Sequence, residues 1–376
     1  MTQLRKKFRQ FIRLATHTQL LPILESGDDP LIGGQAVIEG VMMRAPHSYC
    51  VTVRRADGTT ATDQGLLERP SEKYKVLGWP VIRGVGTLGQ AMSLGIKTLR
   101  FSANQALIDE AELESSGAES PSSVAEPPSS DDAKSMAGDG QNINVTSRNE
   151  AAKEDVKEET KSSEISGWMM TLNVIFSIAF FIFLYKFIPL VITTQIQEHS
   201  SWLSGNIAFN LVDGVIRLAI FLTFLVLISQ MEDIRRVFQY HGAEHKVVFN
   251  YESGKPVDIA TSQAFTTFHP RCGTSFLMVV MLISIVVYSL IPVEGFALRF
   301  LMRILLLPVI AGISYEVIRF AAKHQGTLWS SMVLPGLWLQ RITTKDPADD
   351  QVEISIQSLE AAMALEKEQN GELVVA

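Results

Sequence analysis

Long apolar runs between Trp168 and Leu339 constrain the fold of this chain more than any other feature of its sequence. A helix needs about 20 apolar residues to cross a lipid bilayer, where helices and closed barrels alone satisfy their own backbone groups. The runs that reach this length are 168–192, 210–231, 274–293 and 296–320. The sequence therefore predicts a mainly α-helical, polytopic membrane protein with about four transmembrane helices.

Two further stretches carry apolar residues but are not expected to span. The run 327–339 is too short and is broken by a Pro-Gly pair at 335–336, which favours an interfacial or re-entrant helix. The tail 346–376 has apolar residues at helical spacing and predicts a solvated amphipathic helix. Inside the second span, Asp213 and Arg217 lie four residues apart, so we expect them to neutralise each other.

Basic residues near the span ends predict the orientation, because Lys and Arg accumulate in cytoplasmic loops. The connection 193–209 contains neither residue, whereas the connection 232–273 contains five of them. An even number of spans with both termini in the cytoplasm is consistent with the number of Lys and Arg residues in every connection. Two cysteines, Cys50 and Cys272, cannot build a disulfide framework and indicate a reducing compartment. We therefore expect a multi-pass protein of the inner membrane, in contact with membrane lipid.

The residues before the first span divide into segments of different character. Residues 1–30 form a basic amphipathic segment without the features of a signal peptide. Residues 31–108 predict a small β-containing cytoplasmic unit, because β-branched residues flank an Asp-Gly pair as in a hairpin and a helical pattern follows over 80–99. The glycine-rich start of this unit, 31–44, suits tight turns and close packing, with ligand binding as the alternative.

Residues 109–166 are rich in Ser, Glu, Asp, Pro and Lys and have few large apolar side chains, so they predict a disordered acidic insert. This insert carries most of the net charge of −7, which therefore says little about partners. We expect no nucleic-acid partner, and the sequence leaves protein partners and homo-oligomerisation open. The transmembrane domain is expected over 167–345, with the connection 232–273 on its cytoplasmic side.

A histidine motif in the connection 232–273 is the strongest candidate for chemistry. His241 and His245 are four residues apart, which places both imidazoles on one face of a helix and within reach of one metal ion. Glu244 lies within a turn of both, where a carboxylate can act as general base towards water at a metal. The order His-x-x-Glu-His is the inverted form of the zinc-peptidase helix motif. Capping or packing by the histidines is the simpler alternative.

Further metal ligands are expected from the segment just before the third span. His269 and Cys272 lie there, and imidazole and thiolate are the ligands that zinc prefers. If both bind together with the two histidines of the motif, the site is full and structural. If one of the four is free, an open position could hold water with Glu244 as base. Glu316 in the fourth span is a rival ligand, although Arg319 or Arg271 could instead pair with it.

Four segments of the sequence resemble those of a known protein family. They are Gly-Gly-Gln-Ala-Val-Ile-Glu-Gly-Val-Met-Met-Arg at 33–44, Tyr-His-Gly-Ala-Glu-His-Lys at 240–246, Phe-His-Pro-Arg-Cys-Gly-Thr-Ser-Phe at 268–276 and Leu-Pro-Gly-Leu-Trp-Leu-Gln-Arg-Ile-Thr-Thr at 334–344. With these segments the chain resembles the YqhQ family over residues 31–105 and 167–360. The resemblance implies a bacterial multi-pass membrane protein of unknown function, of a kind commonly labelled a predicted metal-dependent enzyme. It implies no substrate.

Two functions fit these residues. The first is a metal-dependent hydrolase at the cytoplasmic surface of the membrane, with zinc as the expected ion and a peptide or lipid-linked group as substrate. The alternative is a non-catalytic membrane scaffold or biogenesis factor, in which a structural metal ion attaches the connection 232–273 to the third span. An open, water-bearing position beside Glu244 would favour the first function.

Overall fold

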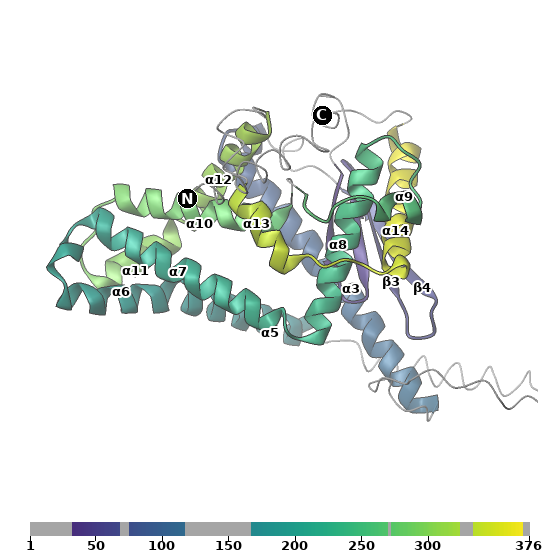
Figure 1. The fold of residues 1–376 in the computed structure, drawn as a ribbon, viewed down its shortest axis with the longest axis horizontal. Helices are drawn as coiled ribbons and strands as arrows, with labels where there is room; N and C mark the ends of the chain where they lie inside the picture. The colour runs from purple at the N-terminus through teal and green to yellow at the C-terminus, as the bar shows by residue number, and fades with distance from the viewer. Residues whose placement is uncertain (1–31, 68–74, 117–166, 270–271, 324–333, 371–376) are drawn as a thin grey trace, which may run out of the picture.

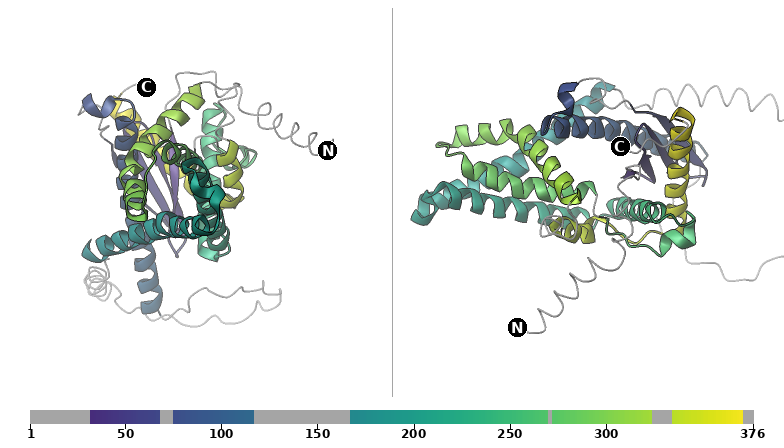
Figure 2. Two further views of the ribbon diagram at one scale, coloured as in Figure 1. Left: turned by 90° about the vertical axis from the view of Figure 1, so that its left-hand side faces the viewer. Right: turned by 90° about the horizontal axis from the view of Figure 1, so that it is seen from above.

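The computed structural model describes residues 32–67, 75–116, 167–269, 272–323 and 334–370. These residues form a bundle of apolar helices and, beside it, a four-stranded sheet with helices on both faces (Figure 1 and Figure 2). The predicted N-terminal segment 1–30 and the range 117–166, which contains most of the predicted insert, lie outside the described residues.

The sheet is antiparallel and follows the order of its strands in the chain. The strands are β1 (Gly33–Val37), β2 (Gly40–Arg44), β3 (Ser48–Arg54) and β4 (Thr60–Leu66). The turn between β3 and β4 contains the Asp-Gly pair, and Gly58 has a φ of 83° that a residue with a side chain rarely adopts. The hairpin predicted at this place is therefore confirmed.

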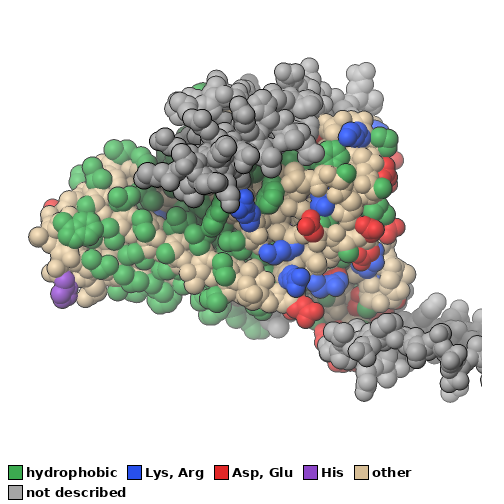
Figure 3. Space-filling view, viewed as in Figure 1, with side chains coloured by type: hydrophobic (Ala, Val, Ile, Leu, Met, Phe, Trp, Pro, Cys, Tyr) green, Lys and Arg blue, Asp and Glu red, His purple; other side chains and the backbone are tan. Residues whose placement is uncertain are grey.

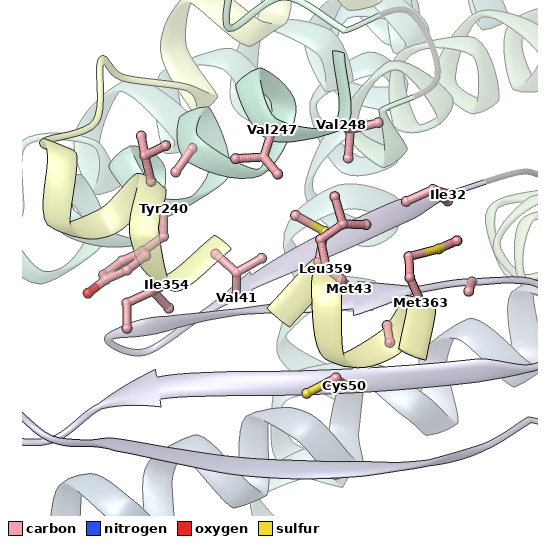
Figure 4. Packing of buried hydrophobic residues seen from close by; sticks show 14 residues of the cluster. Ile32, Val41, Met43, Cys50, Tyr240, Val247, Val248, Ile354, Leu359 and Met363 are labelled. Carbon is pink, nitrogen blue, oxygen red and sulfur yellow. The ribbon is translucent and has the colours of Figure 1, made fainter. Parts of the chain in front are cut away.

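Alternation along the strands gives the sheet two apolar faces. One face packs on α8 (Glu232–Glu252) and α14 (Asp349–Asn370), as Figure 4 shows. Its buried side chains include Val41, Met43 and Cys50 from the sheet, Tyr240, Val247 and Val248 from α8, and Ile354, Leu359 and Met363 from α14. On the other face Met42, Val51 and Val53 pack with Leu94 of α3 (Ile82–Ser116).

The C-terminal helix differs from the solvated helix predicted for the tail. In α14 the side chains of Ile354 and Leu359 are fully or almost fully buried against the sheet and α8. Full burial of one such side chain contributes about 1.5–3 kcal/mol to the free energy of unfolding. The sheet unit is thus built from segments that are remote in sequence, and α14 is one of its core elements.

Helix α3 is longer than the pattern over 80–99 predicted. It continues to Ser116, into the range assigned to the acidic insert. Asp109 and Glu112 in its last turns form ion pairs with Arg55, at the end of the hairpin strand β3. A short 3₁₀ helix, η1 (Lys75–Gly78), precedes α3. These ion pairs attach the end of α3 to the sheet, which the composition of the segment does not reveal.

The apolar bundle contains the four predicted spans. The first combines α5 (Gly167–Ile182), the π-helical turn η2 (Phe183–Phe187) and α6 (Ile188–His199), and it is followed by η3 (Ser201–Ser204). The second is α7 (Asn206–Ile228), and the third is α10 (Gly273–Leu290). The fourth is a pair, α11 (Phe296–Leu305) and α12 (Leu307–Lys323), that is bent by 48°.

The helices of this bundle have the length and surface of membrane spans. Among the described residues three helices are long and apolar enough to cross a membrane, or four if the bent pair counts as one span. In Figure 3 hydrophobic side chains cover the bundle end of the molecule, whereas charged side chains gather over the sheet unit. The structure therefore supports a membrane protein that is mainly helical and carries a small antiparallel sheet.

Two short helices complete the fold. Helix α9 (Ile259–Gln263) follows α8, and α13 (Leu334–Thr343) packs against α10. The contact with α10 requires a glycine, because a Cβ on Gly336 would lie 2.5 Å from the Cα of Ser275. Part of the interfacial helix predicted for 327–339 falls in 324–333, outside the described residues.

Candidate metal centre

The predicted histidine motif and Cys272 meet where the sheet unit joins the bundle. His241 and His245 lie on α8, and Cys272 caps the first turn of α10, the third span. One ligand atom from each of these three residues lies within 4.8 Å of the other two. The separation between His241 Nε2 and Cys272 Sγ is 3.2 Å. Tetrahedral zinc with ordinary Zn–N and Zn–S bonds requires about 3.6 Å between such atoms, so this separation is close to that of a zinc site.

Backbone carbonyl groups orient both imidazoles. His241 Nδ1 lies 2.8 Å from the carbonyl oxygen of Thr343, and His245 Nδ1 bonds to that of Thr267. A carbonyl oxygen can only accept, so in the neutral imidazole Nδ1 carries the hydrogen and Nε2 presents a lone pair. Metal-binding histidines are usually held in this way by a hydrogen bond from the second ring nitrogen.

Burial keeps the imidazole of His245 neutral at physiological pH. Its side chain is only 2% exposed. Desolvation, assisted by the nearby His241, lowers the pKa of His245 to about 4. A metal ligand must present a lone pair rather than a proton. The electrostatics of the site therefore suit metal binding.

Glu244 lies beside the cluster and is buried under the first strand of the sheet. Its Oε2 is 3.4 Å from His245 Nε2, and its side chain is 7% exposed. Burial raises the pKa of Glu244, while a hydrogen bond from the backbone of Gly34 works in the opposite direction. A Cβ on Gly34 would lie 2.6 Å from the Cγ of Glu244. The close packing predicted for the glycine-rich start of the sheet therefore occurs against Glu244.

His269 lies next to the cluster without being part of it. Its ring centroid is 5.6 Å from that of His245, and its Nε2 lies 3.4 Å from the carboxylate of Glu252. Burial lowers the pKa of His269 to about 4, so it too is neutral. The structure thus brings together three of the four predicted ligands, and the fourth stays a prediction.

The fourth resembling segment, at 334–344, forms hydrogen bonds with residues of the site. Gln340 of α13 accepts a hydrogen bond from the backbone N–H of His269 and donates to the carbonyl oxygen of the same residue. It also donates to Ser275 in the first turn of α10. Thr343, in the same segment, accepts from His241. Helix α13 therefore fixes the relative positions of α8, α10 and His269.

Glu316, the rival ligand, has another partner. Its carboxylate accepts hydrogen bonds from the guanidinium of Arg83 on α3, with Nε of Arg83 2.6 Å from Oε1. It does not belong to the His/Cys group found among the described residues. Pairing with an arginine was the predicted alternative for Glu316, but the partners expected were Arg319 and Arg271. The arginine that pairs with it is Arg83, from the segment before the insert.

The roles of several residues at the site could not be predicted from any pattern in the sequence. Thr267 and Thr343 act through backbone carbonyls, which any residue could supply. Gly34 and Gln340 act through contacts with segments remote in sequence. All of them fall within or beside the segments that carry the family resemblance, and that was the one available signal.

A bundle of helices that are long and apolar enough to span a membrane is joined to a helix-covered sheet, with a partly buried His/Cys cluster at the junction. These features indicate a membrane protein with a candidate metal centre. The family described as "Protein of unknown function (DUF1385)" matches residues 79–365, and the chain belongs to this family. It is also 31% identical over 346 residues to the "Uncharacterized protein YqhQ" of Bacillus subtilis (strain 168), which covers 91% of this chain and 95% of the relative. The predicted relationship to YqhQ is confirmed. No solved structure matches the chain.

Proposed function

We propose that this protein is a metal-dependent hydrolase at the cytoplasmic surface of the bacterial inner membrane. One observation carries the proposal: the imidazoles of His241 and His245 are each oriented by a backbone carbonyl at Nδ1, and one ligand atom from each lies within 4.8 Å of the other and of Cys272. A neutral thiol has one hydrogen and can donate it to only one of the two imidazoles at a time. A divalent ion of the zinc type would instead bind both imidazoles and the thiolate together.

Three protein ligands leave a fourth position in a tetrahedral site, as in catalytic zinc centres. A divalent ion bound there would lower the pKa of a water molecule and polarise a carbonyl or phosphoryl group. Glu244, 3.4 Å from His245 Nε2, is close enough to accept the proton of that water. Gly34 holds Glu244 in place, because its own backbone packs directly on the carboxylate side chain.

The location of the site suggests its substrates. Cys272 is the N-cap of a membrane-spanning helix, so the reacting group would lie at the level of the lipid headgroups. A peptide close to the membrane or a lipid-linked group can reach this position. We therefore keep both substrate classes.

A non-catalytic scaffold is the second candidate, and the position of His269 favours it. This buried imidazole lies near enough to His245 that a change of side-chain rotamer would supply a fourth ligand. Four protein ligands would close the site and attach α8 to the third span. The two candidates differ in the role of Glu244, which has none in a closed site.

Metal content tests the part that both candidates share. The wild-type chain, purified without chelator, is expected to contain a stoichiometric divalent ion by elemental analysis. The double variant His241→Ala/His245→Ala is expected to lose it, because two ligands disappear. His199→Ala is the matched control, since this exposed histidine at the end of α6 lies outside the group. Wild-type protein that is free of metal would remove both candidate functions.

Thiol labelling tests the proposed orientation. Ser204→Cys, at the end of η3, is expected to react with an impermeant maleimide in intact cells, whereas Lys255→Cys is expected to react only after lysis. Both positions are exposed in the structure. The wild type serves as control, because Cys50 is buried and Cys272 is only partly exposed. Reversed labelling would place the site on the outer surface and contradict a cytoplasmic hydrolase.

A further inference from the structure

A group of charged side chains lies inside the apolar bundle, at the end opposite the metal centre. Asp213 of α7 pairs with Arg217, as predicted, and also with Arg303 of α11, whose Nη1 lies 2.6 Å from Asp213 Oδ1. All three side chains are at most 4% exposed. Charged groups at such positions are costly in a membrane protein and usually serve a function.

This group has more positive than negative charge. Asp213 is the only carboxylate among its buried members in the described part of the chain, and it serves two guanidinium groups. Lys186, in the π-helical turn of the first span, places its amino group beside this group, with Nζ 3.2 Å from Tyr288 Oη. A buried charge excess of this sign is strongly unfavourable unless an anion compensates it.

A pocket at the same end of the bundle gives an anion access. It is lined by residues that include Asn206, Asn210, Tyr288, Val293, Arg299 and Arg303. The pocket lies between the start of α7, the end of α10 and the start of α11, so it opens near the short connections 200–205 and 291–295.

Arg299 and Arg303, which line the pocket, each have an N–H group that is not used in a hydrogen bond with the described residues. Arg299 donates from Nε to the carbonyl oxygen of Val293 and from Nη1 to Gln197, and in the described part of the chain it forms no ion pair with a carboxylate. Arg303 uses Nη1 for Asp213 and Nη2 for Asn210. Nη2 of Arg299 and Nε of Arg303 have no hydrogen-bond partner among the described residues. Guanidinium groups arranged in this way suit the oxygen atoms of a phosphate.

We propose that this pocket binds the phosphate group of an anionic ligand, either a membrane lipid or free phosphate. The pocket is a second site, distinct from the metal centre. The two sites lie at opposite ends of α10, about 25 Å apart for a helix of this length. The proposal does not depend on hydrolase activity or on the direction in which the chain is inserted.

Two variants that each neutralise one charge, at Arg299 and at the neighbouring Glu294, test the proposal. Arg299→Gln removes a cation that forms no direct ion pair with a carboxylate in the described part of the chain, and it is expected to weaken binding by about tenfold or more. Glu294 is exposed and interacts electrostatically with Arg299, so Glu294→Gln is expected to strengthen binding. Opposite effects from two neutralising changes at one pocket are what anion binding requires. General damage to the fold would not produce them.

Binding is measured by native mass spectrometry on the full chain in detergent, with phosphatidylglycerol, phosphatidylethanolamine and inorganic phosphate as separate probes. Preference for phosphatidylglycerol with the expected variant pattern supports a lipid ligand, and the same pattern with inorganic phosphate supports a free anion. Matching melting temperatures and the variant Arg299→Lys, which keeps the charge, control for folding. If neither variant changes the binding of any probe, or if Glu294→Gln weakens it, the proposal is wrong.

Discussion

Replacement of Glu244 by glutamine is expected to abolish the activity of the protein while leaving its metal content unchanged. The amide has the shape of the carboxyl group but cannot accept a proton, and loss of a general base lowers a rate by about 10²- to 10⁴-fold. Both imidazoles and Cys272 would still converge, because Glu244 is not needed to hold any of them. The measurement is complementation of a deletion strain at matched protein levels, together with elemental analysis of the purified variant.

Glu232→Gln is the control for this experiment. Glu232 lies in the first turn of the same helix, is exposed, and has no contact with the metal centre. It is expected to complement like the wild type. Full complementation by Glu244→Gln, with metal retained, would contradict the hydrolase and favour the structural metal site. Loss of metal from Glu244→Gln would instead mean that the carboxylate is itself a ligand.

Sequence patterns predicted those features of the structure that depend only on residues close together in the chain. Length and hydropathy predict the spans, because the thickness of a bilayer sets the number of apolar residues that a helix needs. The Asp-Gly pair predicts the hairpin, because its glycine supplies a positive φ. The spacing of His241 and His245 predicts that they share one helical face, and in the structure their ring centroids lie 4.5 Å apart.

Contacts between remote segments could not be predicted in the same way. The apolar residues of α14 recur at helical spacing, but the pattern does not name the sheet that covers them, so a solvated helix was predicted where the structure has a buried face. Arg83, which pairs with Glu316, lies before the insert and is 233 residues from Glu316 in the sequence. Thr343 orients His241 through a backbone carbonyl, a group that every residue has. The charges inside the bundle were predicted only as the local pair Asp213 and Arg217.

Alanine in place of Gly242 is expected to destabilise the protein and to disrupt the metal centre at the same time. A Cβ at this position would lie 2.0 Å from the carbonyl oxygen of Lys345, which is backbone and cannot rotate away. Helix α8 or the segment after α13 must therefore move, at a cost of about 1–3 kcal/mol or more in the free energy of unfolding. The same movement would separate His241, the preceding residue, from the carbonyl of Thr343.

Thermal unfolding and metal content of the Gly242→Ala variant measure the two effects, and Gly89→Ala is the matched control. Gly89 is helical and exposed in α3, and a Cβ there would meet no atom within 4 Å. Alanine at such a position stabilises a helix by about 0.5–1 kcal/mol. The two glycine-to-alanine changes should therefore shift the melting temperature in opposite directions, and only Gly242→Ala should release the metal. A Gly242→Ala variant that melts like the wild type would show that α8 and the segment after α13 are not in the close contact on which the geometry of the metal centre depends.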